Sequence, residues 1–220
     1  MKRYAIYFAP PNGALATAGA GWLGRNAVSG DRLPQPDPAL PDLTVAPQRY
    51  GFHATLKAPF RLTATESPES LHAGIGALAA TLRPVVLEGL SVQVFHGSIA
   101  LLPVGPTAAL DALAAEVVMR LDRFRAPLSA DDIARRNPAA LTERQRALME
   151  AWGYPLVLDK FRFHMTLTDR LTTEQVSVLL PLAQAHFADA LRGPVAIDAL
   201  ALFAEDERGV FHQRDHFPLG

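Results

Sequence analysis

The chain has 220 residues, of which 49% are hydrophobic, so it is long enough for one large domain with a substantial core. Its formal charge of −1 gives no broad positive field for long nucleic acid. Local cations around a small anionic substrate fit this charge better. The absence of cysteine excludes disulfides, thiolate metal sites and cysteine nucleophiles.

The first half of the chain predicts strands around one helix. Pro10 and Pro11 end the opening strand, and the Gly-, Ala- and Pro-rich residues 13–47 predict a long loop with Trp22 as its anchor and a short amphipathic piece at about 18–26. Ser67 is the expected N-cap of the helix. In chain order, the expected elements are strands at 3–9 and 49–62, a helix at 67–82, and strands at 85–90, 92–96 and 98–104.

The second half predicts a similar set of elements with one interruption. The expected elements are a helix at 106–123, two helices within 125–160, a strand at 161–170, a helix at 172–191, and strands at 195–204 and 210–219. We therefore expect a duplicated α+β fold in a single pseudo-symmetric domain spanning 1–220. The predicted lobes are about 1–104 and about 105–220, with a helical insertion at about 125–160.

A repeated motif lies at the centre of each half. Each copy has an aromatic residue, His, any residue, Thr and Leu, and each stands in an alternating run typical of a half-buried strand. Two such matches indicate an internal duplication. The copies are Gly51-Phe52-His53-Ala54-Thr55-Leu56 and Arg162-Phe163-His164-Met165-Thr166-Leu167.

Alternation predicts that each motif strand has an apolar face and a polar face. On the polar faces we expect Arg49, Gly51, His53, Thr55 and Lys57 from the first strand, and Arg162, His164, Thr166, Thr168 and Arg170 from the second. Imidazole, hydroxyl and cation on one face suit a phosphoryl group.

This set of groups suits phosphodiester hydrolysis. That reaction needs a base for water, an acid for the leaving oxygen and donors for phosphoryl charge. His53 and His164 fit the two proton-transfer roles, because the pKa of histidine lies near neutrality. Thr55 and Thr166 fit the donor role. No metal or cofactor is needed for this chemistry, and the sequence does not say which histidine is the base.

The two motifs resemble those of the 2H phosphoesterase superfamily, which includes RNA ligase-like proteins and cyclic phosphodiesterases. The resemblance implies two α+β lobes with antiparallel sheets flanking a central cleft and helices outside, and a catalytic set of His53, Thr55, His164 and Thr166. The blocks 49–57 and 152–168 are similar to a branch encoded beside carbon–phosphorus lyase genes, which is DUF1045-like.

The branch resemblance and the local charge suggest further phosphate-binding residues. These candidates are Arg49, Tyr50, Lys57, Arg135, Arg136, Arg162 and Arg170. Arg135 and Arg136 lie in the insertion, where paired arginines also suit the C-terminal end of a helix. His72, His96 and His186 are expected to be structural or solvated. His212, Asp215 and His216 lack a third convergent ligand at recognisable spacing for a metal site.

We therefore expect a cytoplasmic, metal-independent phosphoesterase that acts on a small cyclic phosphate or phosphodiester. Its expected partner is a small phosphorylated substrate, with no membrane association. The branch resemblance implies a ribose cyclic phosphate from phosphonate catabolism. Two alternatives remain open. One is an RNA-end 2′,3′-cyclic phosphodiesterase or 2′-5′ RNA ligase, and the other is a non-catalytic protein that binds a phosphorylated metabolite.

Overall fold

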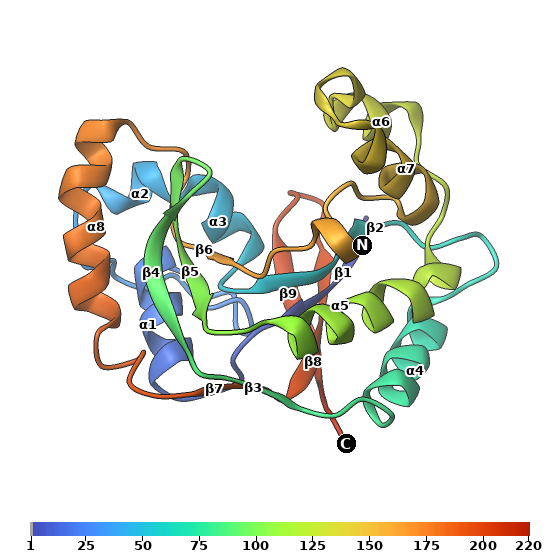
Figure 1. Ribbon diagram of the computed structural model, residues 1–220, viewed down its shortest axis with the longest axis horizontal. Helices are drawn as coiled ribbons and strands as arrows, with labels where there is room; N and C mark the ends of the chain where they lie inside the picture. The colour runs from blue at the N-terminus through green and yellow to red at the C-terminus, as the bar shows by residue number, and fades with distance from the viewer. Residues whose placement is uncertain (1) are drawn as a thin grey trace.

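The computed structural model describes residues 2–220, apart from the side chain of Arg135. Helices and antiparallel strands alternate along it as an α+β fold (Figure 1). The strands are β1 (Tyr4–Phe8), β2 (Ala54–Phe60), β3 (Val85–Leu87), β4 (Gly89–Phe95), β5 (Ser98–Val104), β6 (Met165–Thr166), β7 (Val195–Ile197), β8 (Ala199–Glu205) and β9 (Phe211–Pro218). The helices are α1 (Ala14–Leu23), α2 (Leu40–Leu43), α3 (Val45–Tyr50), α4 (Pro68–Ala79), α5 (Ala108–Arg120), α6 (Ala130–Arg135), α7 (Glu143–Trp152) and α8 (Thr173–Phe187).

Six strands of the main sheet are related in pairs by the internal repeat, and β9 is added at one edge. The seven strands follow the order β4-β5-β6-β2-β1-β8-β9, and every neighbouring pair is antiparallel. The structural repeat divides the chain between β4 and β5, so that in each half a strand, three helices, the motif strand and another helix precede two further strands. The equivalent strands are therefore β1 and β5, β2 and β6, and β4 and β8. Exchanging them reverses the order from β4 to β8 onto itself, which places a pseudo-twofold axis between β2 and β6.

This order exchanges strands between the two halves of the chain. Strand β4 of the first half pairs with β5 of the second, and β8 of the second pairs with β1 of the first. The separate ribbon of β3 and β7 also joins the two halves (Figure 1). The predicted lobes at 1–104 and 105–220 therefore do not coincide with the two wings of the sheet, β4-β5-β6 and β2-β1-β8-β9.

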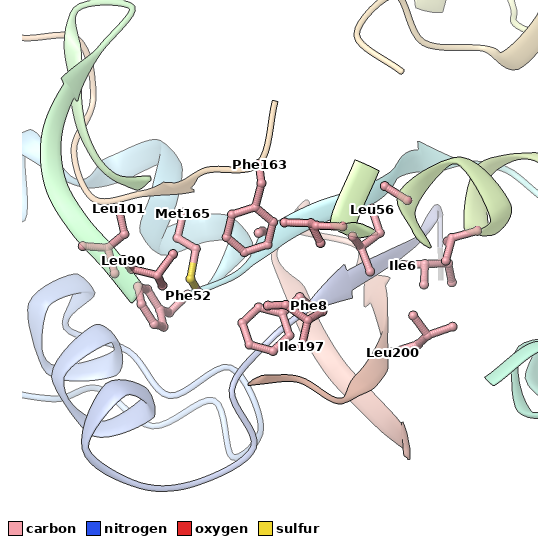
Figure 2. Close-up of a cluster of buried hydrophobic side chains, with 14 of the residues drawn as sticks. Ile6, Phe8, Phe52, Leu56, Leu90, Leu101, Phe163, Met165, Ile197 and Leu200 are labelled. Carbon is pink, nitrogen blue, oxygen red and sulfur yellow. The ribbon is translucent and has the colours of Figure 1, made fainter. Parts of the chain in front are cut away.

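The hydrophobic core lies on one face of the sheet, beneath the motif strands. Phe52, Leu56, Phe163 and Met165 alternate with the polar motif residues, and all four are buried there (Figure 2). Helix α8 packs against β4 and β5, whereas α4 packs against β8 and β9 and α5 against β2 (Figure 1). The alternation predicted from the sequence therefore fixes which face of each motif strand is free for chemistry.

The sequence predicts regular structure in the segment 13–47 only around 18–26, which α1 overlaps, but the structure has more helix there. The segment contains α1 and α2 and the start of α3, so Arg49 and Tyr50 end a helix and do not begin the motif strand. Gly51 follows α3 with φ of 84°, a left-handed conformation that favours glycine and ends the helix. The strand itself begins at Ala54.

The insertion forms the two predicted helices. Ser129 begins α6 and Thr142 begins α7, and each cap side chain accepts a hydrogen bond from the backbone three residues later. Figure 1 shows α6 and α7 projecting together from the rest of the fold, beyond the N-terminal end of β1. Within residues 2–220, the structure has no helix long and apolar enough to span a bilayer.

Trp22 ties α1 to the second motif strand. It is fully buried, its Nε1 donates to the backbone oxygen of Leu167 at 2.9 Å, and its ring lies 5.9 Å from that of Phe187. The expectation that Trp22 anchors its segment is therefore confirmed. The contact also links the segment before the first motif to the end of the second.

Trp22→Phe should lower the free energy of unfolding by about 1–3 kcal/mol, because the buried carbonyl of Leu167 loses its donor. Urea denaturation followed by circular dichroism measures the change. Trp152→Phe, at the half-buried second tryptophan, is the control and should cost less. Equal losses in the two variants would contradict the anchoring role.

Candidate active site

The two motif histidines are positioned by one backbone pairing. Ala54 of β2 lies opposite Met165 of β6 in antiparallel register. Continuing this register places His53 opposite Thr166 and Thr55 opposite His164. Because Ala54 and Met165 point into the core, these four side chains lie on the other face. Diagonal neighbours in such a pair are separated by roughly 7–8 Å, a spacing that suits two groups acting on one phosphorus.

Both imidazoles are held by the same hydrogen bond. His53 Nδ1 lies 2.8 Å from the oxygen of Gly51, and His164 Nδ1 lies 2.7 Å from the oxygen of Arg162. A carbonyl oxygen accepts only, so each Nδ1 donates its proton. In the neutral form, each Nε2 therefore carries a lone pair, and that of His53 accepts from the Thr55 hydroxyl. The two halves of the chain present the same nitrogen for proton transfer.

His53 lies in an aromatic environment. Its ring stacks on that of Tyr7 with centroids 3.8 Å apart, and its Nε2 lies 3.3 Å from Thr55 Oγ1. Burial lowers the pKa of His53 to about 4, an effect that the Gly51 hydrogen bond opposes and the charge of His164 reinforces. His53 is therefore neutral at pH 7 in the free protein.

His164 is also held as the neutral imidazole. Its ring packs against Phe95 with centroids 4.9 Å apart. Burial lowers the pKa of His164, the Arg162 hydrogen bond opposes this, and nearby His96 adds to the lowering. An anionic group between the two rings would reverse these shifts, since it stabilises the charged imidazolium.

Two adjoining cavities meet between the histidines. One of about 550 Å³ is lined by His53, and one of about 450 Å³ is lined by His164. Both are within the range of small-molecule sites. The residues that line both cavities mark their junction, and these are Thr55, Ala58, Ser98, Tyr154, Thr166 and Arg170. The two motif threonines therefore stand where a group shared by the histidines would lie.

Several predicted phosphate ligands reach this cleft. Arg170 lines both cavities, Tyr50 and Arg136 line the one beside His53, and Arg162 lines the one beside His164. The guanidinium of Arg136 also lies over the ring of Tyr154, at 4.9 Å from its centroid. The insertion thus contributes Arg136 to the lining of the cleft, where a phosphate-binding role would require it. The side chain of Arg135 lies outside the described structure.

Most of the chain matches one known protein family. Residues 55–212 match the family described as "Protein of unknown function (DUF1045)", a range that includes the second motif and begins two residues after His53. The chain belongs to the DUF1045 family. This result agrees with the branch resemblance carried by the sequence blocks around the two motifs.

Two curated relatives share a name. "Ribose 1,5-bisphosphate phosphokinase PhnN" of Janthinobacterium sp. (strain Marseille) is 40% identical over 220 residues, covering 95% of this chain and 49% of the relative. The protein of the same name from Laribacter hongkongensis (strain HLHK9) is 36% identical over 211 residues, covering 94% and 49%. The DUF1045 chain therefore spans about half the length of these relatives.

Solved structures resemble the DUF1045 chain more distantly. One, titled "Crystal structure of phosphoesterase", is 14% identical with a TM-score of 0.46, covering 99% of this chain and 98% of the other. Another, the crystal structure of the protein TT0787 from Thermus thermophilus, is 18% identical with a TM-score of 0.49, covering 99% and 97%.

Lys57 does not lie in the cleft of this DUF1045 chain, which corrects its sequence-based prediction. Tyr7 of β1 pairs with Thr55, whereas Ile6 pairs with Lys57, so Leu56 is an extra residue on β2. This β-bulge breaks the alternation and turns Lys57 toward α5. Its Nζ lies 2.8 Å from Asp122 Oδ1 and 3.1 Å from the Val118 oxygen, and the residue is only 3% exposed.

Arg49 also lies outside both cavities. It ends α3, donates from Nε to the oxygen of Gly209, and its Nη2 lies 3.4 Å from Glu205 Oε1. Since Arg49 is on a helix and not on the motif strand, alternation with His53 does not apply to it. Its guanidinium contacts Gly209 in the turn between β8 and β9, Glu205 at the end of β8, and the ring of Tyr50.

The lining of the cleft includes residues to which the sequence assigned no role, among them Arg3, Tyr7 and Tyr154. Arg3 precedes β1, Tyr7 lies on it, and Tyr154 follows α7. Burial raises the pKa of Tyr7 well above its ordinary value, so the phenol stays protonated beside His53. Tyr7 lies beside His53 because β1 pairs with β2. A single sequence does not reveal which strands are neighbours, so this position could not be predicted. Tyr154 belonged to the second sequence block that carried the branch resemblance.

His96 lines the cavity beside His164, where the sequence predicts a structural or solvated residue, whereas His72, His186 and His212 make separate contacts. His212 Nε2 is 3.0 Å from Asp206 Oδ2, whereas Asp215 bonds to His72 of α4. The imidazole of His186 contacts Trp22 of α1. Across the described residues, no three His, Cys, Asp or Glu side chains are grouped closely enough to hold a metal ion.

Lys57→Met should lower the free energy of unfolding by about 1–3 kcal/mol, because Asp122 and the Val118 carbonyl lose a buried donor. The turnover number of the folded variant should change far less than the about 10²-fold typical of a missing acid or base. Lys2→Met, at an exposed lysine, is the matched control for stability. A stable Lys57→Met protein with strongly reduced turnover would restore the predicted role of Lys57 in phosphate binding.

Proposed function

We propose that this DUF1045 chain is a metal-independent phosphoesterase that hydrolyses a small cyclic phosphate or phosphodiester. The observation that supports it best is the matched pair of imidazoles. His53 and His164 follow one backbone pairing, donate from Nδ1 to equivalent carbonyls, and stand beside adjoining cavities. Fixed tautomers at two diagonal positions suit one proton acceptor and one proton donor.

In the proposed reaction, water attacks phosphorus as one Nε2 accepts its proton. The second imidazole, protonated at Nε2, donates its proton to the leaving oxygen as the phosphorus–oxygen bond breaks. Thr55 and Thr166 donate hydroxyl hydrogen bonds to the non-bridging oxygens, and Arg170 supplies positive charge. The product is a phosphomonoester with a free hydroxyl group, so one water molecule is consumed for each bond cleaved.

A phosphorylated sugar is the proposed substrate. The two curated relatives carry the name of an enzyme of ribose 1,5-bisphosphate, and the motif blocks resemble a branch linked to phosphonate use. A ribose cyclic phosphate formed in phosphonate catabolism combines both indications. The relatives' name includes a kinase activity, and many kinases bind nucleotide through a phosphate loop that has a glycine directly before its lysine. This sequence has no such motif, because no glycine directly precedes Lys2, Lys57 or Lys160.

Two other functions use the same cleft. An RNA-end 2′,3′-cyclic phosphodiesterase or 2′-5′ RNA ligase would need a long basic path, which a formal charge of −1 does not favour. A non-catalytic metabolite-binding protein would hold the ligand without turnover. The cavity volumes favour a small ligand over both a duplex and a long single strand.

A turnover screen tests the proposed function. Ribose cyclic phosphates, cyclic nucleotides and short RNA ends should be incubated with the protein in excess chelator and followed by phosphorus NMR. We expect ring opening of a ribose cyclic phosphate. Activity lost to the chelator and restored by a divalent ion would contradict the metal-independent mechanism, and binding without turnover would favour the metabolite-binding alternative.

His53→Ala and His164→Ala should each lower turnover by about 10²- to 10⁴-fold, the usual contribution of a positioned acid or base. The double variant should lose much less than the product of the single losses, because the pair acts as a unit. Thr55→Val and Thr166→Val should cost less than the histidine changes if each supplies one of several donors. Steady-state kinetics at saturating substrate measures all of these. Full turnover in either histidine variant would contradict the acid–base pair.

The pH profile of kcat/KM should be bell-shaped, with its maximum below pH 6.5. Burial lowers the pKa of both histidines from that ordinary value, to about 4 for His53. As pH rises through the lowered values, the pair loses its last proton and the general acid disappears. As pH falls below both, the base is protonated. The two limbs belong to the coupled pair, and a maximum above pH 6.5 would contradict these shifts.

A further inference from the structure

The half of the cleft beside His164 differs in charge from the half beside His53. The described lining of the His164 cavity includes Lys160, Arg162, Arg170 and His96, and it contains no Asp or Glu. The lining of the His53 cavity includes arginines together with Asp132 and Asp169. A second anionic group is therefore favoured on the His164 side.

The cations on this side are weakly compensated. Lys160 Nζ lies 3.8 Å from Asp159 Oδ2, but that carboxylate is already bound by Arg144, with Nη2 2.6 Å from Oδ1. One arginine and one lysine thus share a single carboxylate. The exposed ion pair between Lys160 and Asp159, at 3.8 Å, is weak. The positive charge of Lys160 is therefore poorly neutralised and can attract an anionic ligand.

Arg162 contributes a second such charge. The bonds described for its Nη1 go to backbone oxygens, those of Phe161 at 2.5 Å and Asp159 at 3.4 Å. Backbone oxygens orient a guanidinium but do not cancel its charge. Arg162 therefore presents a positioned cation two residues before His164, and a guanidinium matches two oxygens of a phosphate.

The charges on the His53 side are more balanced. The guanidinium of Arg3 there is paired with Glu205 through Nη2 and Oε1 at 2.6 Å. Arg136 and Arg170 also line this cavity, but so do the carboxylates of Asp132 and Asp169, whereas the His164 side has no carboxylate in its lining. The His164 half is therefore the better place for a second anionic group.

We propose that the substrate carries a second, terminal phosphate, which Lys160 and Arg162 bind in the His164 half of the cleft. This proposal rests on the proposed function, and it adds an orientation to it. The reacting phosphoryl group lies at the junction beside Thr55 and Thr166, and the sugar lies between it and the terminal phosphate, beside Tyr154, which lines both cavities. The volume of about 450 Å³ beside His164 is ample for a phosphate and part of a sugar.

The experiment compares ribose cyclic phosphate with the same compound bearing a phosphate at the other end of the sugar. The wild-type protein should show at least about tenfold higher kcat/KM for the doubly phosphorylated compound, since charge-assisted hydrogen bonds to phosphate add binding energy. The double variant Lys160→Met/Arg162→Met should bring this ratio close to one. Lys2→Met/Arg120→Met removes the same two kinds of charge from exposed positions and should keep the wild-type ratio.

Each outcome decides between the hypotheses. Equal kcat/KM for the two compounds in the wild-type protein would overturn the second phosphate site and leave the phosphoesterase proposal intact. A dinucleotide ending in a 2′,3′-cyclic phosphate that outperforms both would overturn the assignment to a small sugar. Turnover of none of the three would overturn the proposed function. The second site would then be judged by calorimetry with ribose 5-phosphate, which should bind the wild-type protein at least about tenfold more tightly than the double variant, and equal binding would overturn it.

Discussion

The arrangement of the cleft depends on one backbone pairing at the centre of the sheet, between Ala54 and Met165. Within the described residues, this pair joins β2 to β6, and it lies on the pseudo-twofold axis. The two motifs are related through it, so the histidines become diagonal neighbours and each faces the threonine of the other half. A slip of one residue in either strand would turn that strand's imidazole into the core and expose Ala54 or Met165 in its place. Burial of Phe52, Leu56 and Phe163 opposes such a slip.

The same geometry controls the state of the imidazoles. Burial favours the neutral ring, and a carbonyl two residues earlier selects the tautomer in each half. Tyr7 stacks under His53 and limits its rotation. Because the free protein disfavours charge at both rings, a bound anion has a large effect on their protonation. Binding of a phosphoryl group would therefore raise the pKa of the imidazoles, so that one of them gains the proton it needs to act as the acid.

Local sequence patterns predicted much of this arrangement. Alternation around the two motifs placed His53, Thr55, His164 and Thr166 on one face, and turn and cap residues located α4, α5, α7 and α8. Long-range features escaped prediction. The bulge at Leu56 depends on pairing with β1, and it moves Lys57 from the cleft to Asp122. The helix ending at Tyr50 depends on Gly51, whose left-handed conformation the alternating pattern concealed. Tyr7 enters the cleft only because β1 and β2 are neighbours.

The exchange of β4 and β8 also determines how the two halves depend on each other. Separated from its partner, either half would lose a neighbouring strand of its sheet, because β4 pairs with β5 and β8 pairs with β1. The two halves could therefore complete the sheet only as an intertwined pair in which each gives a strand to the other. Their linkage in one chain makes this assembly independent of protein concentration and lets each half carry its own features. The bulge in β2, the insertion before β6 and the unequal charge along the cleft are such differences.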